Sequence, residues 1–393
     1  MENFRSFYGT DLSNFESKGC TFTSSEIASQ GEIWRKLCNI LQEKKDEIAS
    51  FQKKTESIKN LRIIFTGAGS SSYVGETAAC IINRTANIHC EAISTTDIVS
   101  SPFSVLHRDT PTLLVSIARS GNSPESAGAV QYARSIVKDL WELTIVCDGN
   151  SALAKSTAES SKGMILLMPE GSNDKGFAMT SSVSCMVLAC FAFFNNERLD
   201  AICNDINNLA DLVDQKGLHF AEIAKSWAEK NYERLIIIGS GCCRGIAKEA
   251  ALKSMELTAG TVNTGNESAL GFRHGPKTVI KDNTLTVHLI STDSLTAKYD
   301  MDLLKEINTQ KKGNKVIVLS AVSVEADENI VIPTVNKNAD TELYFGICAL
   351  VFCQLLAMYK SISLGLYVDN PVPTGEVSRV VSGVTLYALD SKG

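Results

Sequence analysis

A repeat with a spacing of 172 residues is the strongest structural signal in this chain of 393 residues. Three blocks with strand-like sequences in the first half recur in the second half at this one spacing. The matching blocks are IIFTGAG from Ile63 and LIIIGSG from Leu235, TLLVSIA from Thr112 and TLTVHLI from Thr284, and LTIVC from Leu143 and KVIVL from Lys315. Repeats of about 20 to 50 residues build solenoids, so a period this long indicates two copies of a whole domain.

Short apolar runs rich in Val, Ile and Leu alternate along the chain with longer segments of helical periodicity. This alternation predicts an α/β fold in which each copy is a parallel sheet with helices on both faces. The predicted strands are 62–66, 90–94, 112–118, 142–147 and 164–168 in the first copy, and 234–238, 284–290, 315–319 and 329–332 in the second.

The repeat divides the chain into three parts. Residues 1–45 form a lead-in with a predicted helix over Ser25–Ile40. Two α/β domains follow, the first at 46–212 and the second, with a C-terminal tail, at 213–393. The acidic stretch Asp200–Asp214 is interpreted as a helix and the connection between the domains.

The overall composition excludes several classes of protein. Hydrophobic residues make up 44% and charged residues 21%, as in ordinary globular proteins. The net charge of −6 disfavours nucleic-acid binding, which needs a basic face. The N-terminus lacks the pattern of a secretory signal, and the apolar stretches Val183–Phe194 and Gly346–Tyr359 are shorter than the about 20 residues that cross a bilayer. We therefore expect a cytoplasmic protein without a membrane partner, in which both stretches are buried helices.

The twelve cysteines predict neither a metal site nor disulfides, because the chain has no CxxC pair and no zinc-like His/Cys spacing. Without an export signal, we expect the thiols to stay reduced. Some of them lie in apolar runs, where a free cysteine packs like a small hydrophobic residue. These are Cys80, Cys185, Cys190, Cys348 and Cys353.

A loop rich in glycine and serine, GAGSSSYVG at residues 67–75, follows the first predicted strand. Glycines at this place allow a tight turn and let backbone N–H groups approach an anion at a helix N-terminus. A dinucleotide-binding loop is the alternative. However, the third glycine comes six residues after the second, and Asp97 comes too late for the acidic residue expected about twenty residues on. We therefore predict that Gly69, Ser70 and Ser71 bind a bare phosphate group.

A second hydroxyl-rich loop, ARSGNSPES at residues 118–126, follows the third predicted strand. The carboxyl ends of parallel strands meet at one edge of the sheet, so two such loops can hold one phosphate from both sides. This adds Arg119, Ser120 and Ser123 to the predicted phosphate site. The alternative, that these side chains merely cap helices, stays open because capping and anion binding use the same N–H groups.

The second copy lacks these features. Cys242 and Cys243 replace the serines after Gly241, and Asp293 stands where an anion would bind. The sequence therefore predicts one phosphate site in each chain, in the first domain.

Instead, the second copy carries groups suited to proton transfer. Glu256 lies on a predicted helix over Lys248–Ala259, and His274 precedes a Gly-Pro pair on a constrained turn. Isomerising an aldose needs a base for the C2 proton and a group that opens the sugar ring. A carboxylate and a neutral imidazole suit these tasks at neutral pH. The alternatives are a solvated surface charge for Glu256 and a structural role for His274.

The motifs TGAGSSSYVG, ARSGNSPES, AMTSS, ALKSMEL and FRHGP together resemble the tandem sugar-isomerase (SIS) domain proteins. The chain is most similar to the AgaS family, galactosamine-6-phosphate deaminases also described as tagatose-6-phosphate ketose/aldose isomerases. The resemblance covers nearly the whole chain. It implies two tandem SIS domains and an enzyme of aminosugar catabolism that uses neither a metal nor an organic cofactor.

A more distant resemblance, to the isomerase half of glucosamine-6-phosphate synthase, implies roles for single residues. Glu256 would be the C2 base, and His274 would open the ring across a homodimer interface. Lys253 matches a further active-site lysine, and Thr180 and Ser181 match a loop near the reactive end of the sugar. The phosphate would be bound by Ser70, Ser71, Ser120 and Ser123.

The chain departs from the synthase in two ways: the first, the lack of an ammonia source, favours degradation over synthesis, and the second is consistent with a different sugar. We expect no glutamine-hydrolysing domain, because residues 1–45 are too short to encode one. Where the synthase has a tail lysine over its site, this chain has Glu376, with Arg379 close by. The roles of these two residues are left open, as is that of Glu267, which is either an orienting partner of His274 or an exposed loop acid.

The resemblance implies that galactosamine 6-phosphate is converted through an enolamine to tagatose 6-phosphate and ammonia. A simple aldose–ketose isomerase acting on tagatose 6-phosphate is the first alternative. A sugar-phosphate sensor is the second, although such proteins carry a DNA-binding domain for which the lead-in is too short. An oxidoreductase is disfavoured by the missing ribose-binding acid.

Overall fold

The computed structural model describes residues 7–9, 11–86, 88–310, 312–381 and 383–389. The chain forms two compact units, each built around one five-stranded sheet, which we call the first-sheet unit and the second-sheet unit. The first-sheet unit comprises Glu32–Asp174, Ser181–Asn204 and Gly375–Gly393, and the second-sheet unit comprises Met1–Gly31, Lys175–Thr180 and Asp205–Thr374.

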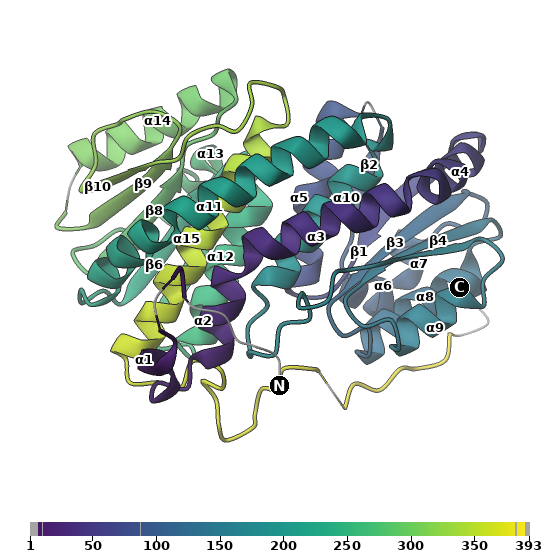
Figure 1. Cartoon of the computed structure of the whole chain (residues 1–393), viewed down its shortest axis with the longest axis horizontal. Helices are drawn as coiled ribbons and strands as arrows, with labels where there is room; N and C mark the ends of the chain where they lie inside the picture. Colours follow the sequence, from purple (N-terminus) through teal and green to yellow (C-terminus); the bar gives the residue numbers. More distant parts are fainter. Residues whose placement is uncertain (1–6, 10, 87, 311, 382, 390–393) are drawn as a thin grey trace. The chain divides into compact units, whose positions relative to one another are not determined.

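The first sheet is parallel and has the strand order β2-β1-β3-β4-β5 (Figure 1). Its strands are β1 (Arg62–Thr66), β2 (Cys90–Ala92), β3 (Thr112–Ala118), β4 (Leu140–Val146) and β5 (Gly163–Leu167). Because β2 and β3 lie on opposite sides of β1, the chain changes its direction of sheet growth between β1 and β3. Ligands of open α/β sheets bind at such a switch point, beyond the carboxyl ends of the strands.

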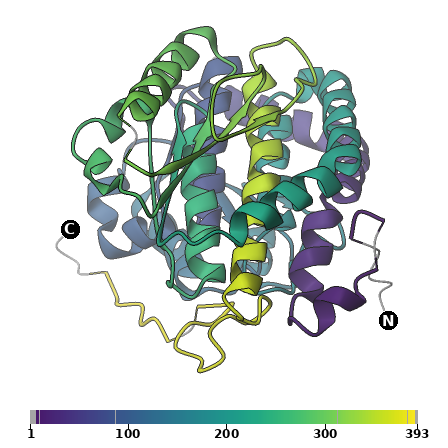
Figure 2. The ribbon, with the colours of Figure 1, turned by 90° about the vertical axis from the view of Figure 1, so that its left-hand side faces the viewer.

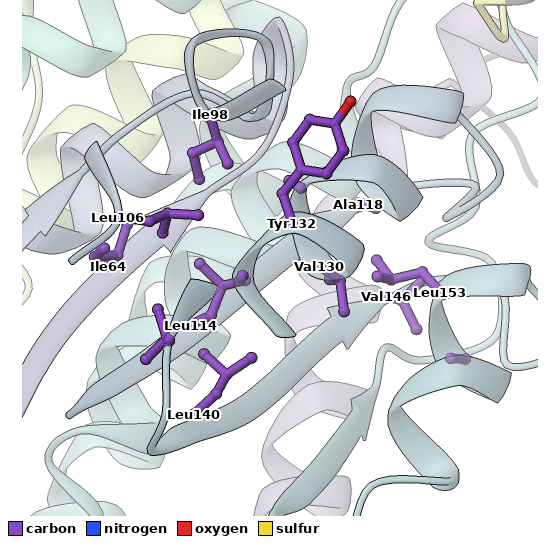
Figure 3. Close-up of a cluster of buried hydrophobic side chains, with 14 residues drawn as sticks. Ile64, Ile98, Leu106, Leu114, Ala118, Val130, Tyr132, Leu140, Val146 and Leu153 are labelled. Atoms are coloured by element: carbon purple, nitrogen blue, oxygen red, sulfur yellow. The ribbon is translucent and has the colours of Figure 1, made fainter. Parts of the chain in front are cut away.

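Helices cover both faces of the first sheet. One face packs against α6 (Thr95–Ser100), α7 (Pro102–Val105), α8 (Pro124–Ile136) and α9 (Ala152–Ala158). Figure 3 shows the resulting apolar core, in which Ile64 and Leu114 of the sheet lie beneath Val130 and Tyr132 of α8. The other face packs against α5 (Ser70–Thr85) and α10 (Ser181–Phe193). The same unit holds α4 (Lys45–Glu56) and the short 3₁₀ helix η1 (Asn196–Arg198).

The second sheet repeats this topology, with parallel strands in the order β10-β9-β8-β6-β7. Its strands are β6 (Arg234–Gly239), β7 (Asn263–Glu267), β8 (Thr284–Leu289), β9 (Lys315–Ser320) and β10 (Glu328–Val331). The predicted duplication and α/β fold are therefore confirmed. β7 was not predicted, because its sequence NTGNE has no apolar side chain to mark it as a strand. It occupies the edge position that β2 has in the first sheet.

The helices of the second-sheet unit also divide between the two faces of its sheet. Ile236 and Ile238 pack with Phe272 of α13 (Ala269–Phe272) and Leu303 of α14 (Ser294–Thr309). On the other face, the hydroxyl of Thr264 donates to the carbonyl of Ala251 at 3.1 Å. That face packs against α12 (Cys243–Leu257), and α15 (Thr341–Ser363) packs against α12. Helices α14 and α15 therefore lie on opposite sides of the sheet (Figure 2).

Both apolar stretches are buried helices, as predicted. Every residue of α10 is buried. The other stretch belongs to α15, which at 23 residues is longer than the predicted run and is long and apolar enough to cross a membrane. However, 89% of its most apolar window is buried inside the structure, as in the core helix of a globular protein.

The N-terminal region and the unit boundaries differ from the sequence prediction. The predicted helix Ser25–Ile40 is two helices, α2 (Thr21–Ala28) and α3 (Gln30–Glu43), which follow the short α1 (Ser13–Glu16). No connection interrupts the stretch around residue 212, because α11 (Leu199–Ala228) continues through it. The two compact units also interleave along the chain, whereas the predicted domains 46–212 and 213–393 are continuous segments.

All twelve cysteines are free thiols. Cys185, Cys190, Cys348 and Cys353 are buried as predicted. Cys80 is exposed, because it lies on the solvent side of α5 rather than on its packed face.

Candidate active site

The loop after β1 brings serine hydroxyls to the N-terminus of the 16-residue helix α5. Gly67 has no room for a side chain, since a Cβ atom there would lie 2.6 Å from the Cβ of Ser71. Gly69 adopts φ 54°, a left-handed conformation that favours glycine, and α5 begins directly after it. Ser70 and Ser71 are buried in the first helical turn. The geometry provides hydroxyl and N–H donors at a positive helix end, which suits an anion.

The loop after β3 has the same construction. Gly121 adopts φ 62°, and a Cβ atom there would lie 2.5 Å from the hydroxyl of Ser151. Ser123 precedes α8 but makes no capping hydrogen bond with its side chain, and its hydroxyl pairs with that of Ser126 at 2.7 Å. Helix capping alone therefore does not account for the serine at this position.

The strand pairing brings the two loops to the same edge of the first sheet. β1 and β3 are adjacent and parallel, with Thr66 opposite Ser116, so the loops that follow them both lie beyond the carboxyl ends. The loop after β2 joins this edge, where the N–H of Thr95 donates to the carbonyl of Gly67 at 2.9 Å. The predicted phosphate-binding loops thus flank the switch point of the first sheet.

Arg119, a predicted phosphate ligand, is buried and contacts the C-terminal tail. Its guanidinium donates to the carbonyl of Arg379 at 2.8 Å. The guanidinium of Arg379 in turn donates to the side chain of Asn173 at 3.2 Å and to the carbonyl of Asp174. The structure therefore gives Arg379, whose role the sequence left open, a contact that fixes the tail beside the loop after β3.

The predicted sugar-binding residues Thr180 and Ser181 are both buried without exposure to solvent. The N–H of Ser181 donates to the carboxylate of Asp174 at 3.1 Å, and its hydroxyl donates to the same oxygen. Ser182 makes the matching pair of bonds to the other oxygen of Asp174. The carbonyl of Thr180 accepts from the side chain of Gln354 at 3.2 Å. These contacts make Ser181 part of the N-terminal cap of α10, a role that the sequence did not indicate.

Helix α12 holds a buried chain of three charged side chains. Lys253, which is completely buried, lies with its Nζ 2.5 Å from Oε2 of Glu256 and 3.3 Å from Oε1 of Glu249. The side chain of Glu249 is 1% exposed, whereas that of Glu256 is 27% exposed. Glu256 is therefore a carboxylate held in place on its buried side and open to solvent on the other, which suits a general base.

His274 lies on an exposed turn between α13 and the 3₁₀ helix η2 (Pro276–Val279). The backbone N–H of His274 donates to the backbone carbonyl of Gly271 at 3.0 Å. Gly275, the next residue, has φ 120°, and no atom lies within 4 Å of the position of a Cβ atom. The turn therefore presents the imidazole at the surface of the second-sheet unit.

Within the second-sheet unit, Glu256 and His274 do not lie on the same side of the sheet. Glu256 is on α12, which covers one face with α15. His274 follows α13, which packs with α14 on the other face. The elements that carry these two residues are thus separated by the sheet.

The edge of the second sheet that corresponds to the phosphate loops is occupied by buried carboxylates. Asp300 accepts from the hydroxyl of Ser240 at 2.6 Å and from the N–H of Ser291 at 3.0 Å. The hydroxyl of Ser291 donates to Glu342 at 2.6 Å. Burial raises the pKa of Asp300, and these hydrogen bonds oppose the shift. Two internal acids therefore stand at an edge where an external anion would bind.

The predicted acid of this edge, Asp293, has a different role. Its carboxylate accepts from the N–H of Thr296 at 2.9 Å, which makes it the N-cap of α14. Glu267 lies at the end of β7, and its carboxylate accepts from the N–H of Ser268 at 2.8 Å. That contact is with the start of α13, whereas the two roles that the sequence left open were an orienting partner of His274 and an exposed loop acid.

Among the residues that the structure describes, no group of three or more His, Cys, Asp or Glu side chains could hold a metal ion. The sequence analysis missed Glu249, although its position four residues before Lys253 is typical of an ion pair on one face of a helix. It also missed Asp174, Asp300 and Glu342, whose partners are distant in sequence and leave no local pattern.

A family model for the SIS domain matches residues 58–196, a range that contains all five strands of the first sheet. D-galactosamine-6-phosphate deaminase AgaS of Shewanella sp. (strain ANA-3) is 38% identical over 372 residues, which cover 94% of this chain and 92% of that protein. This chain belongs to the AgaS family.

Two solved structures are similar to this AgaS-family chain over nearly its whole length. A Clostridium novyi protein, named as a candidate tagatose-6-phosphate ketose/aldose isomerase, has a TM-score of 0.93 and 38% identity, covering 98% of this chain and 100% of that one. The tagatose-6-phosphate ketose/aldose isomerase of Escherichia coli has a TM-score of 0.85 and 32% identity, covering 93% and 96%. The family inferred from the sequence motifs is thus confirmed, and so are the two SIS-type sheets.

Proposed function

We propose that this chain is an enzyme of aminosugar catabolism that converts galactosamine 6-phosphate and water to tagatose 6-phosphate and ammonia. The substrate class follows the family, whose named members act on six-carbon sugar phosphates. The observation that carries the reaction type is the carboxylate of Glu256, which is held by Lys253 and partly open to solvent. Proton transfer of this kind calls on no metal or organic cofactor, and we propose a cytoplasmic enzyme.

The phosphate is bound, in this proposal, by the loops at the switch point of the first sheet. The N–H groups of the first turn of α5 and the hydroxyls of Ser70, Ser71, Ser120 and Ser123 are its donors, with Gly69 allowing close approach of the backbone. Arg119 adds a positive charge behind them while holding the tail. Thr180 and Ser181 are proposed to lie near the reactive end of the sugar, with Ser181 held in place by the carboxylate of Asp174.

The chemistry proceeds by two proton transfers and one hydrolysis. His274 assists ring opening, and Glu256 removes the proton from C2 of the open aldehyde to give an enolamine. Return of that proton to C1 leaves an imine at C2. Water adds to the imine carbon, and the C–N bond breaks to release ammonia and the ketose. Lys253 acts through Glu256 by holding its carboxylate in one orientation.

A homodimer is part of this proposal. The imidazole of His274 is exposed, and α13 lies on the face of the second sheet opposite to the α12 helix that carries Glu256. This separation supports a site in which His274 is contributed by the second copy of the chain. Analytical ultracentrifugation gives the mass, and mixing the E256Q and H274N proteins tests the sharing, because a shared site regains activity in mixed dimers.

The test of the reaction is direct. Purified protein is incubated with galactosamine 6-phosphate and, separately, with glucosamine 6-phosphate, and ammonia and ketose are both measured. We expect ammonia and tagatose 6-phosphate in equal amounts from the first sugar. The Glu256→Gln variant should lose about 100-fold to 10,000-fold in turnover, while the exposed control Glu229→Gln keeps full activity. Full turnover by Glu256→Gln would remove the proposed base.

The names of the two solved relatives favour a second candidate, a plain ketose/aldose isomerase. The same residues would serve it, because an aldose with a hydroxyl at C2 passes through an enediol and ends as a ketose without hydrolysis. Interconversion of tagatose 6-phosphate with an aldose, with no ammonia from either aminosugar, would select this alternative. Binding of a sugar phosphate without turnover would instead indicate a sensor.

A further inference from the structure

Glu306 on α14 binds two cations that flank His274. The Nε of Arg273 lies 3.0 Å from one carboxylate oxygen of Glu306, and Lys277 donates to the other oxygen. Lys277 also donates to the side chain of Gln310, one turn further along the helix, at 2.6 Å. A single carboxylate thus joins the residue immediately before His274 to the residue three positions after it.

The segment between these two contacts has little else to fix it. It consists of His274, Gly275 and Pro276, all of which are exposed. Gly275 has φ 120° and open space around its Cβ position, so packing does not hold it in place. Pro276 restrains the backbone locally, but it does not tie the turn to the rest of the unit. The backbone bonds His274 N–H to Gly271 and Thr278 N–H to Gly275 stabilise the turns at either end. The conformation of the turn therefore depends on the two ion pairs.

The ion pairs persist at neutral pH. The hydrogen bond from Lys277, followed by its charge and that of Arg273, holds the pKa of Glu306 below its usual range. The three side chains are 21% to 32% exposed, which shields them partly from water. An ion pair that is partly exposed contributes little to global stability. However, two pairs on one carboxylate can select a single conformation of a short loop at small cost in folding energy.

We propose that Glu306 is a positioning residue, which fixes the turn that carries His274 through Arg273 and Lys277. This inference rests on the proposed role of His274 in catalysis, because a fixed imidazole matters only if it acts on the substrate. Glu306 does not itself touch the sugar. Its effect is expected on the rate of the chemical step, since binding of the phosphate is assigned to the first-sheet unit.

Two measurements on Glu306→Gln test the proposal, with Asp302→Asn as the matched control. Asp302 lies one turn earlier on α14, is exposed, and makes no ion pair within the described part of the chain. The first measurement is hydrogen–deuterium exchange of the peptide that covers residues 271–280. The second is steady-state kinetics with galactosamine 6-phosphate. We expect Glu306→Gln to exchange faster in this peptide and to lose about tenfold in kcat with KM and Tm little changed.

Each outcome is decisive. Exchange at the wild-type rate in Glu306→Gln would show that the ion pairs do not fix the turn. Faster exchange with unchanged kcat would show that the fixed turn does not matter for catalysis, and either result overturns the proposal. If the wild-type enzyme released no ammonia, the proposed function would fail, and the exchange data alone would still report whether Glu306 holds the turn. Partial recovery of kcat in Glu306→Asp, which keeps the charge on a shorter side chain, is a further expected result.

Discussion

The ammonium of Lys253 lies 2.5 Å from the carboxylate of Glu256 and is completely buried. A buried charge is stable only when it is paired, so Glu249 on the other side of the lysine is as much a part of this arrangement as Glu256. The three side chains lie on one face of α12, where the helix fixes their spacing. The candidate base is therefore oriented by the fold before any substrate binds.

Replacing Lys253 by Met should destabilise the protein by about 3 to 5 kcal/mol, because two carboxylates are left without their shared cation. The double variant Lys253→Met with Glu249→Gln should recover part of this loss, since it removes one of the two carboxylate charges that lose their shared cation. Urea unfolding followed by circular dichroism measures both. A double variant no more stable than the single one would contradict the buried ion pairing.

The two loop glycines Gly121 and Gly171 should respond differently to alanine. Both have positive φ angles, which cost alanine about 1 to 2 kcal/mol. Only Gly121 lacks space, because its Cβ atom would meet Ser151, whereas nothing lies within 4 Å at Gly171. We expect Gly121→Ala to lose about 2 to 4 kcal/mol in all and to weaken phosphate binding. Equal losses of stability in both variants, measured by thermal unfolding, would argue against the tight packing of the loop after β3.

His288 should make the protein sensitive to acid. It is buried on β8 with no hydrogen-bond partner for either ring nitrogen among the described residues, and burial lowers its pKa to about 4. The unfolded chain, with a pKa of about 6.5, binds the proton first. Stability is therefore full above about pH 6.5 and is lost as the pH falls to about 4, by about 3 kcal/mol.

The control for this effect is His288→Leu, which fills the site with an apolar side chain that cannot titrate. Its free energy of unfolding should fall less between pH 7 and pH 4.5 than that of the wild type. If both proteins lost the same stability over this range, other groups would be responsible for the acid sensitivity.

Substitution of the buried residue Asp174 should reduce the stability of the protein strongly. Its carboxylate accepts from the N–H groups and hydroxyls of Ser181 and Ser182, all of them buried. Asp174→Ala leaves these donors unpaired, and we expect a loss of about 3 kcal/mol or more. The reference is Asp293→Ala, which removes an ordinary N-cap and should cost about 1 kcal/mol. Chemical denaturation of the two variants gives the comparison, and equal costs would contradict the buried network.

Most of the strands and their order along the chain could be predicted from the sequence, because the spacing of apolar residues indicates which residues are buried. β1 and β3 were predicted residue for residue. β7 was missed because its half-buried edge strand contains no apolar residue, although one face packs against α12. Its existence could still have been inferred from the repeat, since β2 has a counterpart about 172 residues later.

The candidate site was predictable only in part. Glu256 and His274 could be selected from motifs, and the sheet topology accounts for the two phosphate loops. The contacts of Arg119 with the carbonyl of Arg379, and of Ser291 with Glu342, join residues far apart in the chain. Such contacts depend on tertiary packing, and no local spacing encodes them.

The C-terminal tail has a practical consequence for work with this protein. Tyr132 donates its hydroxyl to the carbonyl of Tyr387, and Leu386 packs so closely on Gly128 that a Cβ atom there would lie 2.7 Å away. Leu389 reaches the apolar core shown in Figure 3. Cutting the chain after Thr374 would therefore expose apolar side chains of α8 and promote aggregation. An affinity tag is better placed at the N-terminus than in place of this tail.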